Sequence, residues 1–408
     1  MPLSKPYLLV LFSVPFMRNA ENSLCVSKAW AKDLIEHTKY IENLTLISYF
    51  SDESPPPDSV VIENNPTLKN VRFVMIPKPK NTLNAVLMLP RTINTIWNEL
   101  NKTHIVHSAV AGWPIPEAWI ICPLLIFKKR FHFINVESAF WRIPVGRKAS
   151  VKQKIRSIIN ECFNKWCLQR ANLTTFTHEG YKKSLLGKIQ HKGFVIPASW
   201  IDAENIIDSA QFESLQQTKL NRINKPIKLI FVGRLVVEKG ILLLIQAVSD
   251  LLDENHLLTL DIIGDGPLLN ECKKLIQTNN MNEKIKLCGT VSYGQEFFIL
   301  LQSYDLMIVP SLSDEQPRNV FDAFSQALPL LCSDTEGLIQ CVDINETGYF
   351  FKTGDIESLK YQLIQITENR LDLLNLGSSC VIAATKLTHK EMHLKRLEIM
   401  RVALTHYE

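Results

Sequence analysis

No stretch of this sequence is apolar over the roughly 18 residues that a membrane-spanning helix needs. The net charge of +4 is small, so nucleic-acid binding is not expected. Nine cysteines are scattered along the chain, and their odd number argues against a disulfide framework. Internal repeats and low-complexity tracts are absent as well. What remains is a chain of 408 residues, 46% apolar and 21% charged, which is the composition of a globular protein long enough for two domains.

The N-terminus has some features of a signal peptide, because Lys5 precedes an apolar run from Tyr7 to Phe16. The run is short, is interrupted by Pro15 and lacks a small-residue cleavage site. We therefore interpret it as the buried first strand of an α/β domain, which predicts a cytoplasmic protein.

Apolar strand patterns alternate with helical patterns along the whole chain, which predicts an α/β fold of parallel sheets with helices on both faces. In the first half, we expect strands near 6–13, 44–49, 71–77, 104–107, 131–137, 173–177 and 194–197, and helices near 25–38, 83–101, 117–127 and 147–167. The polar segment 206–225 is the candidate linker between a first domain, 1–205, and a second domain, 226–385. A final amphipathic helix is expected within 386–408.

Three blocks in the second half share the order strand, glycine-containing or acidic loop, helix. The first is the apolar run 227–232 followed by Gly233-Arg234 and, five positions on, Lys239-Gly240. The second is the run 258–263 followed by Gly264-Asp265-Gly266-Pro267. The third is the run 306–309, then Pro310-Ser311, an acidic loop and a helical pattern over 317–328.

These residue types suit a ligand that carries a diphosphate. Arg234 offers a planar guanidinium and Lys239 a flexible ammonium around the same loop. A helix that begins near Pro317, after a strand, directs backbone N–H groups toward an anion. Asp314 lies in the loop and Asp322 eight positions on, so the two carboxylates approach a ligand from different directions.

Together the blocks resemble the donor-binding domain of the retaining glycosyltransferases of the GT-B fold, in the large family 4 group. The family pattern is G-R-x-x-x-x-K-G, then G-D-G-P, then P-S-x-x-E-G-x-P with a second acid eight residues after the first, and later a T-G. Four separated motifs in register make the resemblance specific. The residues that match are Gly233, Arg234, Lys239, Gly240, Gly264, Asp265, Gly266, Pro267, Pro310, Ser311, Pro317, Thr347 and Gly348.

The sequence departs from the family pattern at several positions. Both family glutamates become aspartates if Asp314 and Asp322 form the acid pair, and the small residue after the first acid is Glu315. Glu315 is therefore an alternative working carboxylate. The family's glycine pair is Glu336-Gly337, and Ala327 stands where a glycine usually precedes the next strand.

The resemblance implies two Rossmann-like domains that face each other across a cleft, with the C-terminal helix crossing back to the first domain. It implies transfer of a sugar, with retention, from a nucleotide-diphosphate sugar to a hydroxyl acceptor. Arg234 and Lys239 would stabilise the leaving diphosphate, Asp314 or Glu315 would contact the sugar, and Asp322 the ribose. Further donor-binding candidates are Gly233, Gly264, Arg318, Asn319 and Val320. Because no D-x-D motif stands in the right context, we expect no metal and no other cofactor.

The acceptor is expected to bind the first domain, where polar clusters follow two predicted strands. Glu137 stands where many relatives have a polar residue that faces the donor sugar, and it is the candidate to orient an acceptor hydroxyl; alternatively, it pairs with Arg142 and shapes the loop. His107 is either a site residue or a buried core histidine. Trp113 and Trp141 either stack on a sugar or lipid or pack in the core.

Residues 145–192 carry eleven Lys and Arg against two Glu, and an apolar segment upstream ends in Lys128-Lys129-Arg130. Such a pattern suits peripheral contact with the anionic inner face of a membrane; the alternative is a solvated basic surface. The acceptor class would then be a saccharide or a lipid-linked saccharide used in cell-surface glycan synthesis. Two other functions stay open: a nucleotide-sugar 2-epimerase of the same fold and a non-catalytic nucleotide-sugar binding protein.

Overall fold

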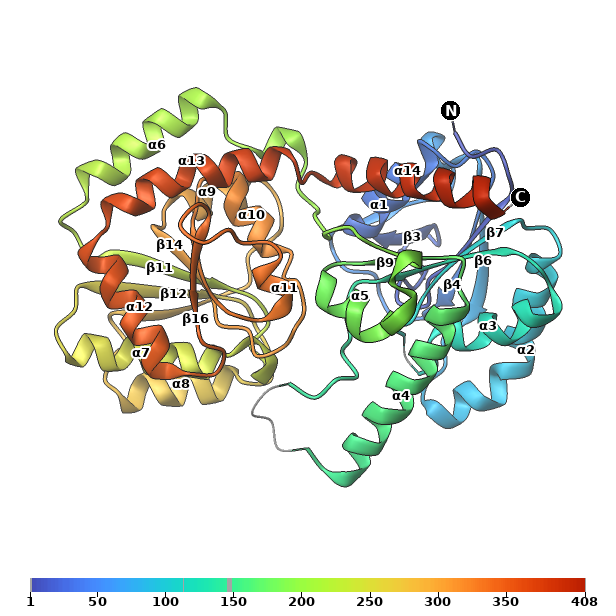
Figure 1. Cartoon of the computed structure of the whole chain (residues 1–408), viewed down its shortest axis with the longest axis horizontal. Coiled ribbons are helices and arrows are strands. Elements are labelled where there is room, and N and C mark those ends of the chain that lie inside the picture. Colours follow the sequence, from blue (N-terminus) through green and yellow to red (C-terminus); the bar gives the residue numbers. More distant parts are fainter. Residues whose placement is uncertain (1, 113, 145–148, 408) are drawn as a thin grey trace. The chain divides into compact units, whose positions relative to one another are not determined.

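The computed structural model describes residues 2–112, 114–144 and 149–407. The chain forms two compact units. Unit 1 comprises Met1–Trp141, Lys152–Ile196 and His393–Glu408, and unit 2 comprises Arg142–Val151 and Pro197–Met392. Each unit is a parallel sheet covered by helices on both faces (Figure 1), so the predicted α/β class with two Rossmann-like domains is confirmed.

The main sheet of unit 1 has seven parallel strands in the order β10-β9-β8-β7-β1-β4-β6. The order reverses between β7 and β1, which is the topological switch point of this sheet. The strands are β1 (Tyr7–Val10), β4 (Leu44–Phe50), β6 (Val71–Pro77), β7 (Ile105–Ala109), β8 (Phe131–Val136), β9 (Leu173–Phe176) and β10 (Gly193–Val195). Every one of the predicted strands of the first half is therefore present, with ends shifted by a few residues.

A small antiparallel sheet in unit 1 was not predicted. It consists of β2 (Met17–Arg18), β3 (Leu24–Ser27) and β5 (Ser59–Val61). Because β3 takes up the residues that we expected to begin a helix at 25, helix α1 spans only Lys28–Thr38. The other helices of this unit are α2 (Thr82–Leu100), α3 (Glu117–Phe127), α4 (Val151–Arg170) and α5 (Glu179–Leu186).

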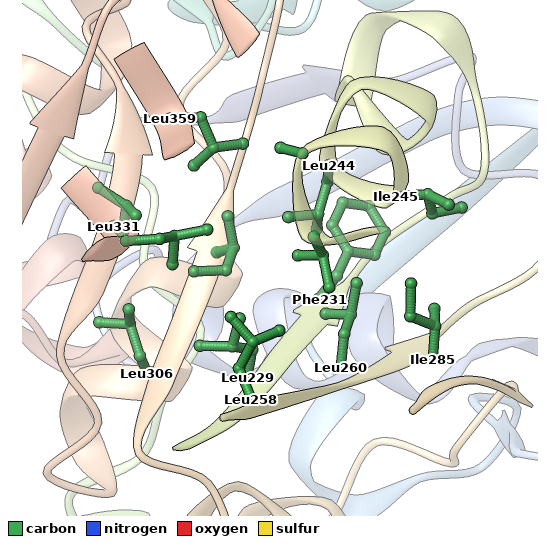
Figure 2. Packing of buried hydrophobic residues seen from close by; sticks show 14 of the residues in the cluster. Leu229, Phe231, Leu244, Ile245, Leu258, Leu260, Ile285, Leu306, Leu331 and Leu359 are labelled. Atoms are coloured by element: carbon green, nitrogen blue, oxygen red, sulfur yellow. The ribbon is translucent and has the colours of Figure 1, made fainter. Parts of the chain in front are cut away.

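The sheet of unit 2 has six parallel strands in the order β13-β12-β11-β14-β15-β16. Its central strand β11 buries side chains on both faces, with Leu229 and Phe231 in one core and Ile230 in the other. Figure 2 shows the first of these cores, where side chains of β11, β12 and helix α7 pack together. The strands are β11 (Ile227–Val232), β12 (Leu258–Ile263), β13 (Ile285–Gly289), β14 (Leu306–Val309), β15 (Leu330–Ser333) and β16 (Gly348–Phe351).

The helix expected over 317–328 is shorter, because α10 spans Asn319–Ser325. Ala327 has a φ of 51°, in the left-handed region that a glycine adopts without strain, so the chain leaves the helix there and turns into β15. The glycine usual in the family at this position therefore has a conformational reason. The remaining helices of unit 2 are α7 (Ile241–Asp253), α8 (Leu269–Thr278), α9 (Gln295–Gln302), α11 (Glu336–Ile339), α12 (Ile356–Glu368) and α13 (Leu371–Thr385).

The segment 206–225, which we expected to be a linker, lies within unit 2 and forms helix α6 (Ser209–Asn221). Asp208 caps its N-terminus and receives the backbone N–H of Gln211, while the Gln211 side chain bonds back to the Asp208 N–H. This capping box compensates for the weak apolar pattern. Gln216 then ties α6 to α13 through the Leu374 carbonyl at 3.1 Å.

Helix α14 (His389–Tyr407) belongs to unit 1 from His393 onward, as the predicted crossover requires. It packs on α1 through a buried polar network. Asp33 Oδ1 lies 3.1 Å from His393 Nε2, and Asp33 Oδ2 lies 3.3 Å from His37 Nδ1. The Tyr40 hydroxyl lies 3.0 Å from His393 Nδ1, and Arg396 approaches His37 Nε2 at 3.4 Å.

Burial of this network fixes its protonation states. Burial lowers the pKa of His107 and of His393 well below the usual range, so both rings are neutral. Burial also opposes the charge of Arg396, but the neighbouring Tyr40, Asp33 and Glu137 raise its pKa overall. Arg396 is therefore a buried cation whose stability depends on nearby anions.

Asp33→Asn should destabilise unit 1 strongly, because it removes an anion beside the buried Arg396. Loss of hydrogen bonds to a charged buried group typically costs about 1.5–3 kcal/mol, and Asp33 is the carboxylate that His37 and His393 contact. Denaturant unfolding followed by tryptophan fluorescence reports mainly on this unit, since six of the seven tryptophans fall within it. Glu36→Gln on the same helix is the matched control. Its partner Lys39 is 58% exposed, so we expect the free energy of unfolding to fall by less than about 1 kcal/mol. Equal effects of the two substitutions would contradict this role of the network.

Candidate donor-binding site

The candidate site is the carboxyl edge of the unit 2 sheet, at the point where the strand order reverses between β11 and β14. Open parallel sheets bind ligands at this switch point, because the loops after the two strands diverge there. The loop after β11 carries Gly233 to Gly240, and the loop after β14 carries Pro310 to Arg318. The predicted motifs therefore meet at one edge.

Glycines allow these loops to pack backbone against backbone. Gly240 has a φ of 66°, and a Cβ there would lie 1.9 Å from the Pro310 carbonyl oxygen. A Cβ on Gly264 would lie 1.9 Å from the Gly233 carbonyl oxygen. Neither position admits a side chain, so the loops after β11, β12 and β14 are held in contact.

Lys239 is the cation that the structure ties to the acidic loop. It ends the short helix η4 (Val237–Lys239), and its side chain is only 19% exposed. Lys239 Nζ donates to Glu315 Oε2 at 3.4 Å across 76 positions of sequence. Arg234 lies in the same loop and is exposed. A partly buried Lys next to a solvent-facing Arg suits an anionic ligand that enters from solvent.

The two adjacent acids differ in their surroundings. Glu315 is 28% exposed and contacts Lys239, whereas Asp314 is exposed. Gly337 on α11 packs behind this loop, since a Cβ there would lie 2.5 Å from the Asp314 carbonyl oxygen. The glycine that is kept from the family's glycine pair thus supports the acidic loop.

Asp322 lies on α10 and is 7% exposed. The hydroxyl of Tyr293, in the loop after β13, donates to Asp322 Oδ1 at 3.0 Å. Burial, followed by the nearby Asp322 carboxylate, raises the pKa of Tyr293, so the hydroxyl stays protonated and holds the carboxylate in place. The motifs did not reveal Tyr293, because it is 29 positions from Asp322 and outside the matched patterns.

The three candidates at the start of α10 have different surroundings. Asn319 Nδ2 donates to the Val232 carbonyl at 2.7 Å and joins α10 to the end of β11. The Val320 side chain is fully buried in the second core of unit 2, which leaves only its backbone for a ligand. The Arg318 guanidinium lies 4.3 Å from the ring centroid of Trp200, an aromatic contact that the sequence did not predict.

The acceptor-side candidates that the structure describes lie in or after strands β7 and β8. Glu137 follows β8, is partly exposed and accepts a hydrogen bond from Asn135 Nδ2 at 3.2 Å. His107 lies inside β7, 3% exposed, with its ring stacked on Phe133 at 4.2 Å, which favours the core alternative. Trp141 is 7% exposed, and its indole N–H donates to Glu161 at 2.7 Å, which also favours packing.

The structure adds little on the other two acceptor-side candidates. Arg142 is partly exposed and falls at the start of the segment 142–151, which clusters with unit 2. Trp113 lies outside the described residues. Of the four candidates that the structure describes, Glu137 and Arg142 are thus the two that are partly exposed to solvent.

One set of three potential metal ligands occurs in the part of the chain that the structure describes. It consists of Asp33, His37 and His393, whose ligand atoms lie within 4.8 Å of one another. The set belongs to the α1–α14 network of unit 1, and the Arg396 guanidinium next to His37 disfavours a second cation there. No such set accompanies Arg234 and Lys239 among the described residues.

Comparison with known proteins gives a family match within unit 2. Residues 213–385 match the family model of the glycosyl transferases group 1. The UDP-Gal:alpha-D-GlcNAc-diphosphoundecaprenol alpha-1,3-galactosyltransferase of Escherichia coli is 28% identical over 189 residues, which cover 45% of this chain and 47% of that protein. The chain thus spans about half the length of this relative. The alpha-monoglucosyldiacylglycerol synthase of Acholeplasma laidlawii is 27% identical over 337 residues, 72% of this chain and 83% of that protein.

Solved structures extend the likeness over both units. Sucrose-phosphate synthase from Thermosynechococcus elongatus superposes with a TM-score of 0.72 at 18% identity, covering 98% of this chain and 100% of that chain. HepE of Anabaena, in complex with UDP and glucose, gives a TM-score of 0.67 at 12% identity and covers 97% and 99% of the two chains. At these identities the likeness shows the fold alone. The GT-B fold that the motif resemblance implied is thereby confirmed, and residues 213–385 match the glycosyl transferases group 1.

Proposed function

We propose that this protein transfers a sugar from a nucleotide-diphosphate sugar to a hydroxyl acceptor, with retention at the anomeric carbon. The observation that carries the proposal is the meeting of Arg234, Lys239 and the acidic loop at the switch point of the unit 2 sheet. Two cations and a carboxylate at such an edge match a donor that combines a diphosphate with a sugar. The matched family and the glycosyltransferase relatives support the same reaction class.

The difficult step is departure of the nucleoside diphosphate while positive charge develops at the anomeric carbon. Arg234 and Lys239 stabilise the negative charge that grows on the leaving diphosphate, and such preorganised charge is usually the largest catalytic contribution. These two side chains carry the charge that a divalent ion supplies elsewhere, so we propose that transfer requires no metal. The Glu315 carboxylate that contacts Lys239 also keeps the ammonium in position before the donor binds.

The acidic loop and Asp322 are assigned to different parts of the donor: an acid of the loop contacts the sugar, and Asp322 contacts the ribose. Glu315 is the better placed of the two adjacent acids to accept hydrogen bonds from sugar hydroxyls, because it lies beside Lys239. Asp314 is the less favoured alternative, since it is exposed. Asp322, held by the Tyr293 hydroxyl, accepts the ribose diol.

Unit 1 is proposed to bind the acceptor. Glu137 would orient the acceptor hydroxyl, and Arg142 lies five positions further along the chain. The names of the relatives indicate the class: one acts on a diphosphoundecaprenol-linked sugar and another makes a glucosyldiacylglycerol. We extend that class to this chain as a saccharide or lipid-linked saccharide in glycan synthesis. A cytoplasmic enzyme that works at the inner face of a membrane fits such an acceptor.

Donor turnover tests the proposal and the choice of acid together. With chelator present, the wild-type protein should release nucleoside diphosphate slowly from one of the UDP-, GDP- or ADP-sugars. Glu315→Gln should lower this turnover about 10- to 100-fold, the worth of a hydrogen bond to a charged group. Asp314→Asn is the matched control at the neighbouring exposed position and should stay within about twofold.

The contrary results have distinct meanings. Loss of turnover in Asp314→Asn with a silent Glu315→Gln would return the catalytic acid to Asp314. Turnover abolished by chelator and restored by a divalent ion would contradict the role given to Arg234 and Lys239. A 2-epimerised donor, instead of released diphosphate, would replace the transferase by an epimerase.

Tyr293→Phe should weaken donor binding with little change in kcat, because it loosens Asp322 without touching the reacting atoms. We expect KM to rise about tenfold, as for one hydrogen bond to a charged group. If Asp322 binds the ribose, the substitution should also reduce the preference for ribonucleotide over 2′-deoxyribonucleotide donors. Tyr361→Phe is the control, on a tyrosine 60% exposed on α12. An unchanged KM and an unchanged ribose preference would remove Tyr293 from the site.

A further inference from the structure

Helix α4 of unit 1 has an N-terminal half that its own unit does not cover. From residue 151 to residue 163 no side chain is buried, and this half extends away from the sheet (Figure 1). Among the described residues, the helix packs on its unit toward its other end, where Cys167 and Leu168 are fully buried. Asn164 accepts the indole N–H of Trp119 at 2.6 Å, and Glu161 accepts that of Trp141 at 2.7 Å. A helix that protrudes in this way should be polar on all sides if water surrounds it.

The uncovered half instead carries an apolar stripe. Its residues recur at spacings of three, four and seven positions, so at 3.6 residues per turn they share one face of the helix. Their side chains are strongly exposed, from 46% to 73%. We call this set the α4 stripe: Val151 (73%), Ile155 (53%), Ile158 (63%) and Ile159 (46%). Phe163 (50%) follows one turn later, where its ring packs against Trp119 with 4.9 Å between the ring centroids.

Cations border the α4 stripe on both sides. At 100° per residue, Lys152 and Arg156 flank it on one side and Lys154 on the other. Lys165 lies on the same side as Lys154 and is paired with Glu161 at 3.3 Å. The face opposite the stripe is uncharged, with Gln153, Ser157 and Asn160. The first turn holds no acid, and Glu161 is the single acid of the helix.

Other basic groups upstream are occupied within the unit. Lys128 lies over the Trp97 ring at 3.9 Å and bonds to Asn101, and Arg130 donates to the Leu100 carbonyl at 3.1 Å. The basic segment at the end of α3 therefore serves its own unit in part. The α4 stripe with its flanking cations is the clearer candidate for an external surface.

We propose that the α4 stripe docks this protein on an anionic lipid bilayer, with the helix lying in the plane of the interface. Apolar side chains enter the acyl boundary while lysine and arginine on each flank extend to the phosphates, as long basic side chains do at interfaces. The charge pattern selects this occupant over a second copy of the chain, because two such stripes in contact would bring like charges together. No helix among the described residues is long and apolar enough to span a membrane, so attachment by α4 is peripheral.

This inference adds a partner to the proposed function and does not require it, because bilayer binding is measured without any donor or acceptor. Each Lys or Arg near anionic lipid strengthens binding roughly fivefold, from about 1 kcal/mol per charge. A few such charges and two or three inserted isoleucines give reversible attachment that weakens in high salt.

Co-sedimentation with vesicles tests the proposal on the full-length chain. The wild-type protein should bind phosphatidylserine-containing vesicles at low salt, less at high salt, and should not bind pure phosphatidylcholine vesicles. Ile155→Ser with Ile158→Ser should reduce binding at least tenfold, and serine has a helix propensity close to that of isoleucine. Lys152→Gln with Lys154→Gln should reduce binding by about 25-fold and weaken its salt dependence. Gln153→Ser with Asn160→Ser, on the opposite face of α4, is the matched control and should bind as wild type.

The proposal would be overturned if the wild type did not bind anionic vesicles at low salt, or if the stripe variant bound them as well as the opposite-face control. It would also be overturned if analytical ultracentrifugation without lipid showed a wild-type dimer that the stripe variant does not form. Circular dichroism of each variant checks that α4 remains folded, and the lysine variant tests the same surface without altering the stripe. Nucleoside diphosphate release from the donor in vesicle-free solution should be unchanged in all variants. Failure of vesicle binding with intact release would therefore leave the proposed reaction standing.

Discussion

The candidate site depends on the close backbone contact between loops that glycine alone permits. A side chain at Gly240 would overlap the Pro310 carbonyl, and one at Gly264 would overlap that of Gly233. The parallel sheet already brings the ends of β11, β12 and β14 to one edge, and the glycines reduce the distance between their loops to van der Waals contact. Lys239 and Glu315, 76 positions apart, become neighbours as a consequence.

The same contact between loops also sets the charges around the proposed diphosphate site. A loop that holds Arg234 and Lys239 next to a carboxylate stays partly neutralised without a ligand, and a bound diphosphate then competes for the cations. The proposed function assigns the donor to unit 2 and the acceptor to unit 1. The uncovered stripe of α4 adds a reason for unit 1 to work at a lipid surface, which is where a lipid-linked acceptor resides.

Local patterns in the sequence were sufficient to predict the two parallel sheets and the donor motifs. Strands such as β6 and β11 are short apolar runs between turn residues, and the glycine loops have fixed spacings, so both are visible without long-range information. The helix boundary at Ser325 was missed because it depends on the left-handed φ of Ala327, a residue that rarely adopts it. The helical state of 209–221 was missed because capping by Asp208, rather than an apolar period, supports it.

Contacts between side chains far apart in the chain could not be predicted from the sequence. The preference for Glu315 over Asp314 rests on contact with Lys239, and the setting of Asp322 rests on Tyr293; both contacts join segments far apart in the chain. The sequence left His107 and Trp141 open between a site role and a core role, and their burial beside Phe133 and Glu161 favours the core role. Exposure of the α4 stripe was equally hidden, since an amphipathic pattern alone does not say whether its apolar face is covered.

The central claim is that Arg234 and Lys239 hold a diphosphate without a metal ion. Calorimetric titration of the full-length chain with nucleoside mono- and diphosphates, in the presence of chelator, tests it most directly. The account predicts that one diphosphate binds at least about tenfold more tightly than its monophosphate, as one charge-assisted contact would provide. That difference should disappear in Arg234→Ala and Lys239→Ala and persist in Lys228→Ala, a control at the opposite end of β11. Equal affinity for mono- and diphosphates, or a preference that survives the loss of either cation, would contradict the account.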